Sequence, residues 1–441
     1  MVKTLNPRKL LPLAAGCLLL CANASAMSLM QAYEAALQND PAYRSAYYQA
    51  EGGRENRILG RSSLLPSVSI NYGGSQNRNT IEYFGKSQPQ DYNSRNATVQ
   101  VRQPLFSMDA WARYKQGKAQ SEQAEAQFAS QTQEVIMRVV GAYLEALLKE
   151  DQLALARTER DMYAEQMKVN ALLYKKGEGT RTDELETRSR FDLAEASVLE
   201  AEDALKTAMD TLAGVVGGDV TALDHLRPGY RVLNTDVQSY DEWKKTALAQ
   251  NPDIQALIKG VEVASQEVNK QRAGHMPRLD LNATYGKLDS DTTSTIDEKT
   301  KVRSVGFQLT IPLYQGGAVS AATRQAAANR GKAQADLDAE IDKSMVELRR
   351  NYNQVASSVP RINALLRAEE SAKLLITATE QSIKGGVRIN LDLLTAQRQL
   401  VTAQRDLAQA RYTYMLAALR LRAEAGVLSP DDVRLLAAHF E

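Results

Sequence analysis

The chain is poor in cysteine and histidine. Of its 441 residues only 2 are cysteine, and both, Cys17 and Cys21, lie among the first 26 residues. The rest of the chain therefore has no thiol for a disulfide or for a cysteine-ligated metal site. The 3 histidines, His225, His275 and His439, lack the spacing of metal ligands. We expect no metal and no cofactor.

Proline and glycine are also scarce, with 12 and 25 residues. Because both residues interrupt helices and strands, their scarcity predicts long continuous elements. Neither sign of charge is in excess: 54 basic and 53 acidic side chains leave a net charge of +1. This balance argues against a nucleic acid as partner. After residue 26 no apolar run approaches the ~20 residues of a membrane-spanning helix, so this part could enter a membrane only as strands.

The first 26 residues have the layout of a secretory signal peptide. Basic residues are followed by an apolar run from Leu10 to Leu20 and by the small residues at 24–26. This order predicts cleavage after Ala26. A lipidated Cys17 is the alternative, and it would leave the apolar residues 18–20 on the mature chain.

A seven-residue repeat is present, and it is written twice. Large apolar residues recur near the C-terminal end with alanines three residues later, at Leu393, Leu400, Leu407, Tyr414 and Leu421 and at Ala396, Ala403, Ala410 and Ala417. The same pattern lies 209 positions earlier, at Phe191, Val198, Leu205 and Leu212 and at Ala194, Ala201 and Ala208. It predicts supercoiled helices whose backbones approach closely at alanine.

The whole chain follows this duplication, since Tyr143 matches Tyr352 at the same separation. We predict a signal peptide at 1–26, a first repeat at 27–217, a linker at 218–238, a second repeat at 239–427 and a tail at 428–441. Long helices are expected at about 109–175, 183–214, 318–384 and 391–424, after shorter helical stretches at 41–64 and 252–274. Pro360 is expected to break or kink the third long helix.

Alternating residues predict two strands in each repeat, at about 67–76, 96–106, 278–286 and 302–313. One face of each strand is aliphatic or aromatic and the other is polar. Segments rich in Ser, Thr, Asn and Gly lie between paired strands, at 73–96 and 286–301, and are expected to be exposed loops. A proline marks each junction between strand and helix: Pro66, Pro104, Pro277 and Pro312.

Four strands cannot close into a barrel, and a bilayer forbids an open sheet edge. If the strands span a membrane, several protomers must therefore share one barrel. The alternation alone favours a soluble sheet with one dry face, because the strand signals of a barrel are weak in each segment. The signal peptide, the polar loops and the junction prolines favour the membrane.

In these features the sequence resembles the TolC-like outer-membrane factors of Gram-negative bacteria. The resemblance rests on the duplicated plan, on the phrases Pro104-Leu105-Phe106 and Pro312-Leu313-Tyr314, and on the turns that open each alanine seam. It implies a mainly α fold with a β-barrel portion: a homotrimer with one 12-stranded outer-membrane barrel, continued by a periplasmic α-helical coiled-coil barrel. Within the family the chain looks most like type I secretion components of the protease-exporting AprF and PrtF kind. The implied partners are outer-membrane lipid, a periplasmic adaptor, an inner-membrane ABC transporter and an exported protein, expected to be a protease.

The two turns carry the candidate entrance residues. Gly177 and Gly386 are expected to accept a left-handed backbone, and Asp183 and Asp392 fall in the first turn of the returning helix, where the helix dipole favours a carboxylate. That structural role suffices for both aspartates. The resemblance also implies a gate in which Arg388 links to Thr182 and Asp183. A tyrosine that the family carries near the second turn is Ile383 here, which implies a looser closed state.

No serine elbow, nucleotide loop or acid-base pair is recognisable, so we expect no enzyme. A passive export duct is the leading hypothesis, as the outer-membrane component of either protein secretion or small-molecule efflux. The second hypothesis is a soluble periplasmic coiled-coil scaffold.

Overall fold

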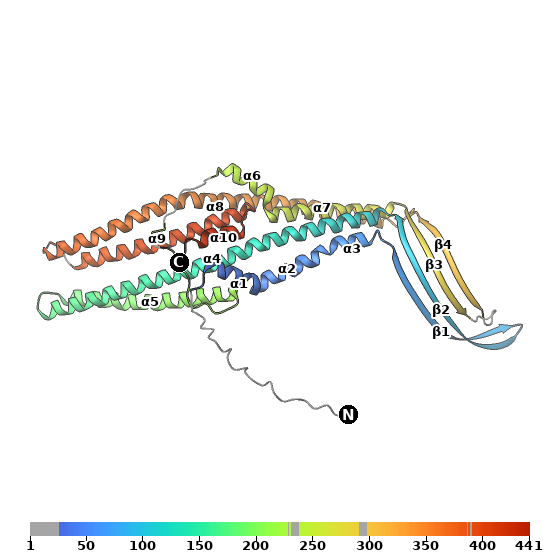
Figure 1. The fold of residues 1–441 in the computed structure, drawn as a ribbon, viewed down its shortest axis with the longest axis horizontal. Helices are drawn as coiled ribbons and strands as arrows, with labels where there is room; N and C mark the ends of the chain where they lie inside the picture. Colours follow the sequence, from blue (N-terminus) through green and yellow to red (C-terminus); the bar gives the residue numbers. More distant parts are fainter. Residues whose placement is uncertain (1–25, 228, 231–237, 291–297, 386, 389) are drawn as a thin grey trace, which may run out of the picture. The chain divides into compact units, whose positions relative to one another are not determined.

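The computed structural model of the chain is mostly helical, with one sheet (Figure 1). It describes residues 26–227, 229–230, 238–290, 298–385, 387–388 and 390–441, so the signal peptide expected at 1–26, except for Ala26, and the turn residue Gly386 lie outside the described residues. The helices are α1 (Leu29–Asn39), α2 (Pro41–Arg54), α3 (Asn56–Ser62), α4 (Met108–Lys175), α5 (Arg181–Val216), α6 (Tyr240–Gln250), α7 (Pro252–Arg272), α8 (Ala318–Lys384), α9 (Asn390–Glu424) and α10 (Pro430–Ala437).

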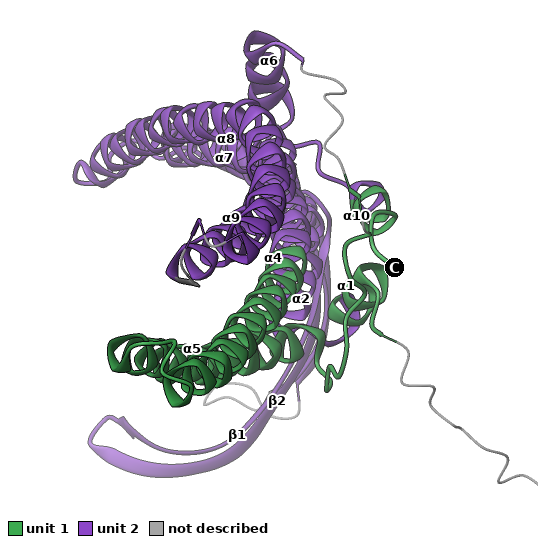
Figure 2. Cartoon of the chain, turned by 90° about the vertical axis from the view of Figure 1, so that its left-hand side faces the viewer, with its two compact units in different colours: residues 1–36, 139–231, 433–441 green, residues 37–138, 232–432 purple. Residues whose placement is uncertain are grey.

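The chain divides into two compact units, coloured separately in Figure 2. The smaller unit holds α1 as far as Ala36, the second half of α4, α5 and the residues from Val433 on. The larger unit, residues 37–138 and 232–432, holds the sheet together with α7, α8 and α9. Each repeat therefore contributes its strands to one and the same unit.

The long helices have nearly the bounds that the sequence predicts. Pro360 lies inside the 67-residue helix α8, which continues through it. The prediction that the helix breaks at this proline is therefore wrong. The proline has no amide hydrogen, so α8 loses one backbone hydrogen bond there but is not interrupted. Next to it, the Ser358 hydroxyl donates to the carbonyl of Gln354 at 2.6 Å. The stretch expected at 41–64 is divided near Glu55 into α2 and α3.

Helices α8 and α9 pack along the alanine seam. Ala396, Ala403, Ala410 and Ala417 are buried, as the seven-residue repeat predicts. Leu407 and Ala410 of α9 form one cluster with Ile362 of α8. Small residues at this seam let the two helix backbones approach closely.

The sheet contains β1 (Ser67–Tyr83), β2 (Lys86–Phe106), β3 (Arg278–Ser290) and β4 (Lys299–Thr310), all antiparallel in that order. The first repeat thus supplies β1 and β2, and the second supplies β3 and β4. The expected loop at 73–96 is wrong, because β1 and β2 continue through it and meet at the turn Phe84–Gly85. Side chains hold this polar hairpin together: Ser75 and Ser94 are joined by a 2.9 Å hydrogen bond, and the Asn79 amide donates to the Tyr92 hydroxyl at 2.9 Å.

The smaller unit is built around the buried side chain of Tyr143 in α4. Its hydroxyl lies 2.9 Å from the carbonyl of Met27 and accepts a hydrogen bond from the Asp224 amide at 3.1 Å, and its ring packs edge-on against Phe440. Burial raises the pKa of this phenol, so it stays protonated and can donate. Tyr143 therefore holds together the start of the described chain, the linker between the repeats and the tail.

Candidate functional site

The register of the four strands gives the sheet one mainly apolar face and one mainly polar face. Charged exceptions on the apolar side include Arg303, opposite Tyr285, and the pair Lys287 and Lys301 nearer the distal end. Opposite residues in antiparallel strands share a face. In one row, Val68, Val101, Ala283 and Val305 stand side by side across all four strands. Neighbouring rows on this apolar face contain Ile70, Tyr72, Val99, Leu281, Tyr285, Phe307 and Leu309. Many of these side chains are open to solvent, Val305 to 75%.

The other face of the sheet is polar. It carries Ser69, Asn71, Thr98, Gln100, Asn282, Thr284, Ser304 and Gln308. A continuous exposed apolar face on four strands needs lipid or another apolar cover, because water solvates it poorly. The opposite polar face suits an aqueous lumen.

An ion cluster joins the two repeats on the polar face, at the end of the sheet next to the helices. Asp280 of β3 is only 2% exposed, and its carboxylate lies 2.8 Å from Nη2 of Arg102 in β2 and 2.9 Å from Nε of Arg278. A buried carboxylate requires such partners, since an unpaired charge would be strongly destabilising. Sequence reasoning missed this cluster because its residues come from different repeats.

The four junction prolines occupy three kinds of position. Pro66 and Pro277 directly precede β1 and β3. Pro104 lies inside β2 at a register shift, beyond the last pair that β2 makes with β1, where its missing amide costs no ladder bond on that side. Pro312 follows the end of β4 by two residues.

The first helix turn lies between α4 and α5. Gly177 has φ +77°, the left-handed conformation that the sequence predicts for it. The Asp183 carboxylate accepts hydrogen bonds from the amide of Thr180 at 3.3 Å and from its hydroxyl at 2.7 Å, and Thr180 Oγ1 accepts from the Asp183 amide at 3.1 Å. This capping box begins α5 and gives Asp183 a structural role in its own helix. Thr182 is exposed.

The second turn lies between α8 and α9. The amide of Val387 donates to the carbonyl of Ser382 at 2.9 Å, and the matching bond in the first turn joins Glu178 to Leu173 at 2.9 Å. Arg388 is exposed, and Asp392 is half-buried in the first turn of α9. Arg388 belongs to the larger unit, whereas Thr182 and Asp183 belong to the smaller one.

The C-terminal end of α9 carries a carboxylate with a shifted pKa. Burial, helped by the nearby carboxylates of Glu347, Asp253 and Glu340 and opposed by Lys343, raises the pKa of Glu424 to about 7. Because this pKa exceeds the value of 4.5 expected when unfolded, the folded chain binds more protons between these two pH values. The contribution of Glu424 to stability is therefore lost as pH rises from about 4.5 through 7.

We expect Glu424→Gln to flatten this dependence. The amide cannot ionise, so the variant should unfold at a higher temperature than the wild type at pH 8 and at a similar one at pH 5. Thermal unfolding followed by circular dichroism at both pH values measures the difference. Glu347→Gln is the matched control, which should lower the Glu424 pKa and give part of the effect. Parallel pH profiles of wild type and Glu424→Gln would contradict the assignment.

No helix in the described part of the chain is both long and apolar enough to span a membrane. Nor do those residues contain a group of three or more His, Cys, Asp or Glu side chains that could hold a metal ion.

Comparison with known proteins reveals the relatives of this chain. The sequence profile of the family described as "Outer membrane efflux protein" matches twice, at residues 32–218 and 243–427. The alkaline protease secretion protein AprF of Pseudomonas aeruginosa is 40% identical over 96% of this chain and 89% of its own length, and the proteases secretion protein PrtF of Dickeya chrysanthemi is 35% identical over 95% and 92%. The outer membrane protein TolC of Vibrio cholerae is 29% identical over 97% of both chains.

Solved structures show the same fold. The CmeC outer membrane channel of Campylobacter jejuni superposes with a TM-score of 0.80 over 94% of this chain and 90% of that one, at 16% identity. The duplicated helices and the four strands thus have the same fold as that protein. The chain belongs to the outer membrane efflux protein family, the TolC-like channel proteins of the bacterial outer membrane.

Proposed function

We propose that the protein is the outer-membrane channel of a type I secretion system and conducts an exported protease across the periplasm and the outer membrane. The observation that carries this proposal is the apolar face that runs across all four strands of an open sheet. AprF and PrtF, both named for protease secretion, are similar over nearly the whole chain and point to the cargo. The same face disfavours the soluble scaffold.

The working unit in this proposal is a homotrimer. β1 and β4 are the edge strands of the described sheet, and edges with unpaired backbone groups are not tolerated in lipid. Pairing β1 of one copy with β4 of the next removes every edge once a ring closes. Three copies supply twelve strands, which leave an open lumen.

The partners in this proposal are a periplasmic adaptor and an inner-membrane ABC transporter, which supplies the energy. The channel itself is passive and has no catalytic role.

A deletion strain tests the cargo. Removing the gene should abolish protease activity in the culture medium while protease accumulates inside the cell, and the wild-type gene should restore export. Unchanged extracellular protease would overturn the secretion role. A small-molecule efflux pump is the second candidate, favoured by the family that the chain belongs to, and it predicts drug sensitivity in the same strain.

The periplasmic entrance is proposed to be held shut by Arg388 acting on Thr182 and Asp183, with Asp392 of each copy contributing to a ring of carboxylates. One exposed ion pair is worth only about 0–1 kcal/mol, so several such links around the trimer must act together. The capping box limits how much Asp183 can contribute to the link with Arg388, since its carboxylate already accepts two hydrogen bonds from Thr180.

We expect Arg388→Ala and Asp183→Ala each to raise single-channel conductance in planar bilayers, because each removes one side of the link. Thr180→Ala is the matched control: it weakens the helix cap by about 1 kcal/mol but keeps the Asp183 charge, so conductance should stay at the wild-type value. Wild-type conductance in both Arg388→Ala and Asp183→Ala would remove the gate.

A further inference from the structure

The hairpin of β1 and β2 is longer than a membrane wall requires. Among the described residues β3 pairs with β2 as far as Ser94, and the wall strands β3 and β4 have 13 and 12 residues, against roughly 9–11 for a tilted membrane strand. Beyond that point eight further pairs, from Gln76↔Asn93 to Tyr83↔Lys86, join β1 to β2, and no strand of the described residues pairs with this part. At ~3.3 Å per residue this two-stranded ribbon is about 26 Å long.

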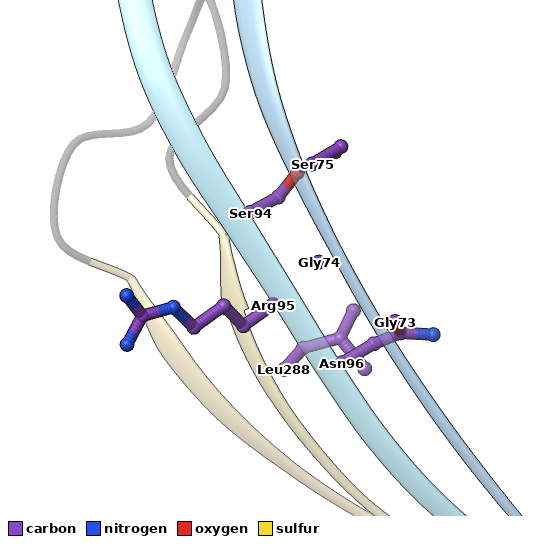
Figure 3. Close-up of a pocket in the computed structure, with 7 residues that line it drawn as sticks. All are labelled: Gly73, Gly74, Ser75, Ser94, Arg95, Asn96 and Leu288. Atoms are coloured by element: carbon purple, nitrogen blue, oxygen red, sulfur yellow. Dashed lines mark hydrogen bonds between the residues drawn. The ribbon is translucent and has the colours of Figure 1, made fainter.

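The ribbon begins at a pair of glycines. Gly73 and Gly74 of β1 face Asn96 and Arg95 of β2, and with Leu288 of β3 they border a hollow of about 370 Å³ (Figure 3). A Cβ on Gly73 would lie 2.5 Å from Oδ1 of Asn96, so this side chain fills the place of the missing one. Glycine inside a strand weakens it and marks a bend. Figures 1 and 2 show the distal hairpin turning away from the line of the sheet.

The ribbon is polar and internally braced. The Asn77 amide donates to the Ser94 hydroxyl at 3.0 Å, and Arg78 pairs with Asp91 at 3.8 Å. The part of the ribbon between the glycines and the tip, called the shaft below, is therefore suited to water rather than to lipid.

The tip of the ribbon is different, because it ends in two exposed aromatic residues. Tyr83 is 72% exposed and Phe84 87%, and their rings contact each other edge-on with centroids 4.5 Å apart. Within the described residues Phe84 is the one residue other than glycine with a positive φ, +49°. This conformation is strained for phenylalanine, and in the described part of the chain the side chain stays exposed beside the Tyr83 ring.

We propose that Tyr83 and Phe84 form an interface between copies of this chain, in which the ribbon tips of neighbouring protomers meet over the external mouth of the pore. This inference rests on the proposed trimeric channel. Twelve strands about 4.8 Å apart, tilted by ~40°, give a barrel radius of about 12 Å, so a 26 Å ribbon that bends at its base reaches the axis. Mutual contact buries the aromatic tips and leaves the polar shafts in water.

Cysteine cross-linking tests the contact directly. The chain has no cysteine after residue 21, so Phe84→Cys adds a unique thiol to the processed protein. Oxidation of the purified protein should link two subunits of each assembly through a disulfide visible on a non-reducing gel. Gln90→Cys, on the shaft opposite Asn79, is the matched control and should not cross-link.

Conductance supplies the second readout. Replacing residues 79–90 by an Asn-Gly turn removes the tip but keeps the wall strands, and should raise conductance by a factor of about two if the tips narrow the mouth. Equal cross-linking at positions 84 and 90 together with unchanged conductance of the shortened channel would overturn this inference alone. A wild-type protein that neither assembles into trimers nor conducts would overturn the proposed function and the inference with it.

Discussion

An arginine in place of Val305 is expected to keep the protein out of the outer membrane. Val305 lies in the middle of β4 on the apolar face, in one row with Val68, Val101 and Ala283. An arginine that faces lipid near the bilayer midplane destabilises a barrel by about 2–4 kcal/mol, and the trimer would carry one such arginine in each protomer. Quantifying the heat-modifiable trimer in outer-membrane fractions measures the loss.

Ser304→Arg is the control for this prediction. Ser304 precedes Val305 in the same strand, at nearly the same depth, but belongs to the polar face opposite Thr284. An arginine there enters an aqueous lumen, so the trimer should assemble in normal amount. If the two variants assemble equally well, the assignment of the faces to lipid and water is wrong.

The second large effect is expected at Gly426, which ends α9. Its φ of +74° already strains any other residue, and an added Cβ would lie 2.7 Å from the amide nitrogen of Asn251 and even closer to the carbonyl of Gln250. Gly426→Ala should therefore lose about 1–2 kcal/mol for the backbone conformation and about 1–3 kcal/mol for overpacking. A lowered unfolding temperature by circular dichroism and less trimer in the membrane would report it.

The duplication offers the matched position for comparison. Gly217 ends α5 with φ +77°, but a Cβ there would meet nothing within 4 Å. Gly217→Ala should therefore lose the backbone part alone. Equal unfolding temperatures for the two alanine variants would show that the close approach of Gly426 to the junction of α6 and α7 does not matter for stability.

Features that repeat along the chain could be predicted from the sequence. The alanine seam, the bounds of α4 and α8 and the alternation of the strands all follow from periodicity. Periodicity can be recognised from residues that are close together in the sequence. The left-handed Gly177 follows in the same way from its place between two helices.

Features that depend on pairing between distant residues could not be predicted. The ribbon beyond Gly74 has the composition of a loop, and only cross-strand bonds such as the one between Asn79 and Tyr92 make it a strand. The buried Asp280 and the central place of Tyr143 depend in the same way on partners far along the chain. The link from Arg388 to Asp183 remains a prediction.

Tyr143 also constrains the order in which the protein can fold. Its hydroxyl and ring contact residues as early as Met27 and as late as Phe440. During vectorial export the first repeat emerges long before the second, yet the packing around Tyr143 must wait for the tail. A truncated or stalled polypeptide therefore leaves this helix face without the packing that the tail provides.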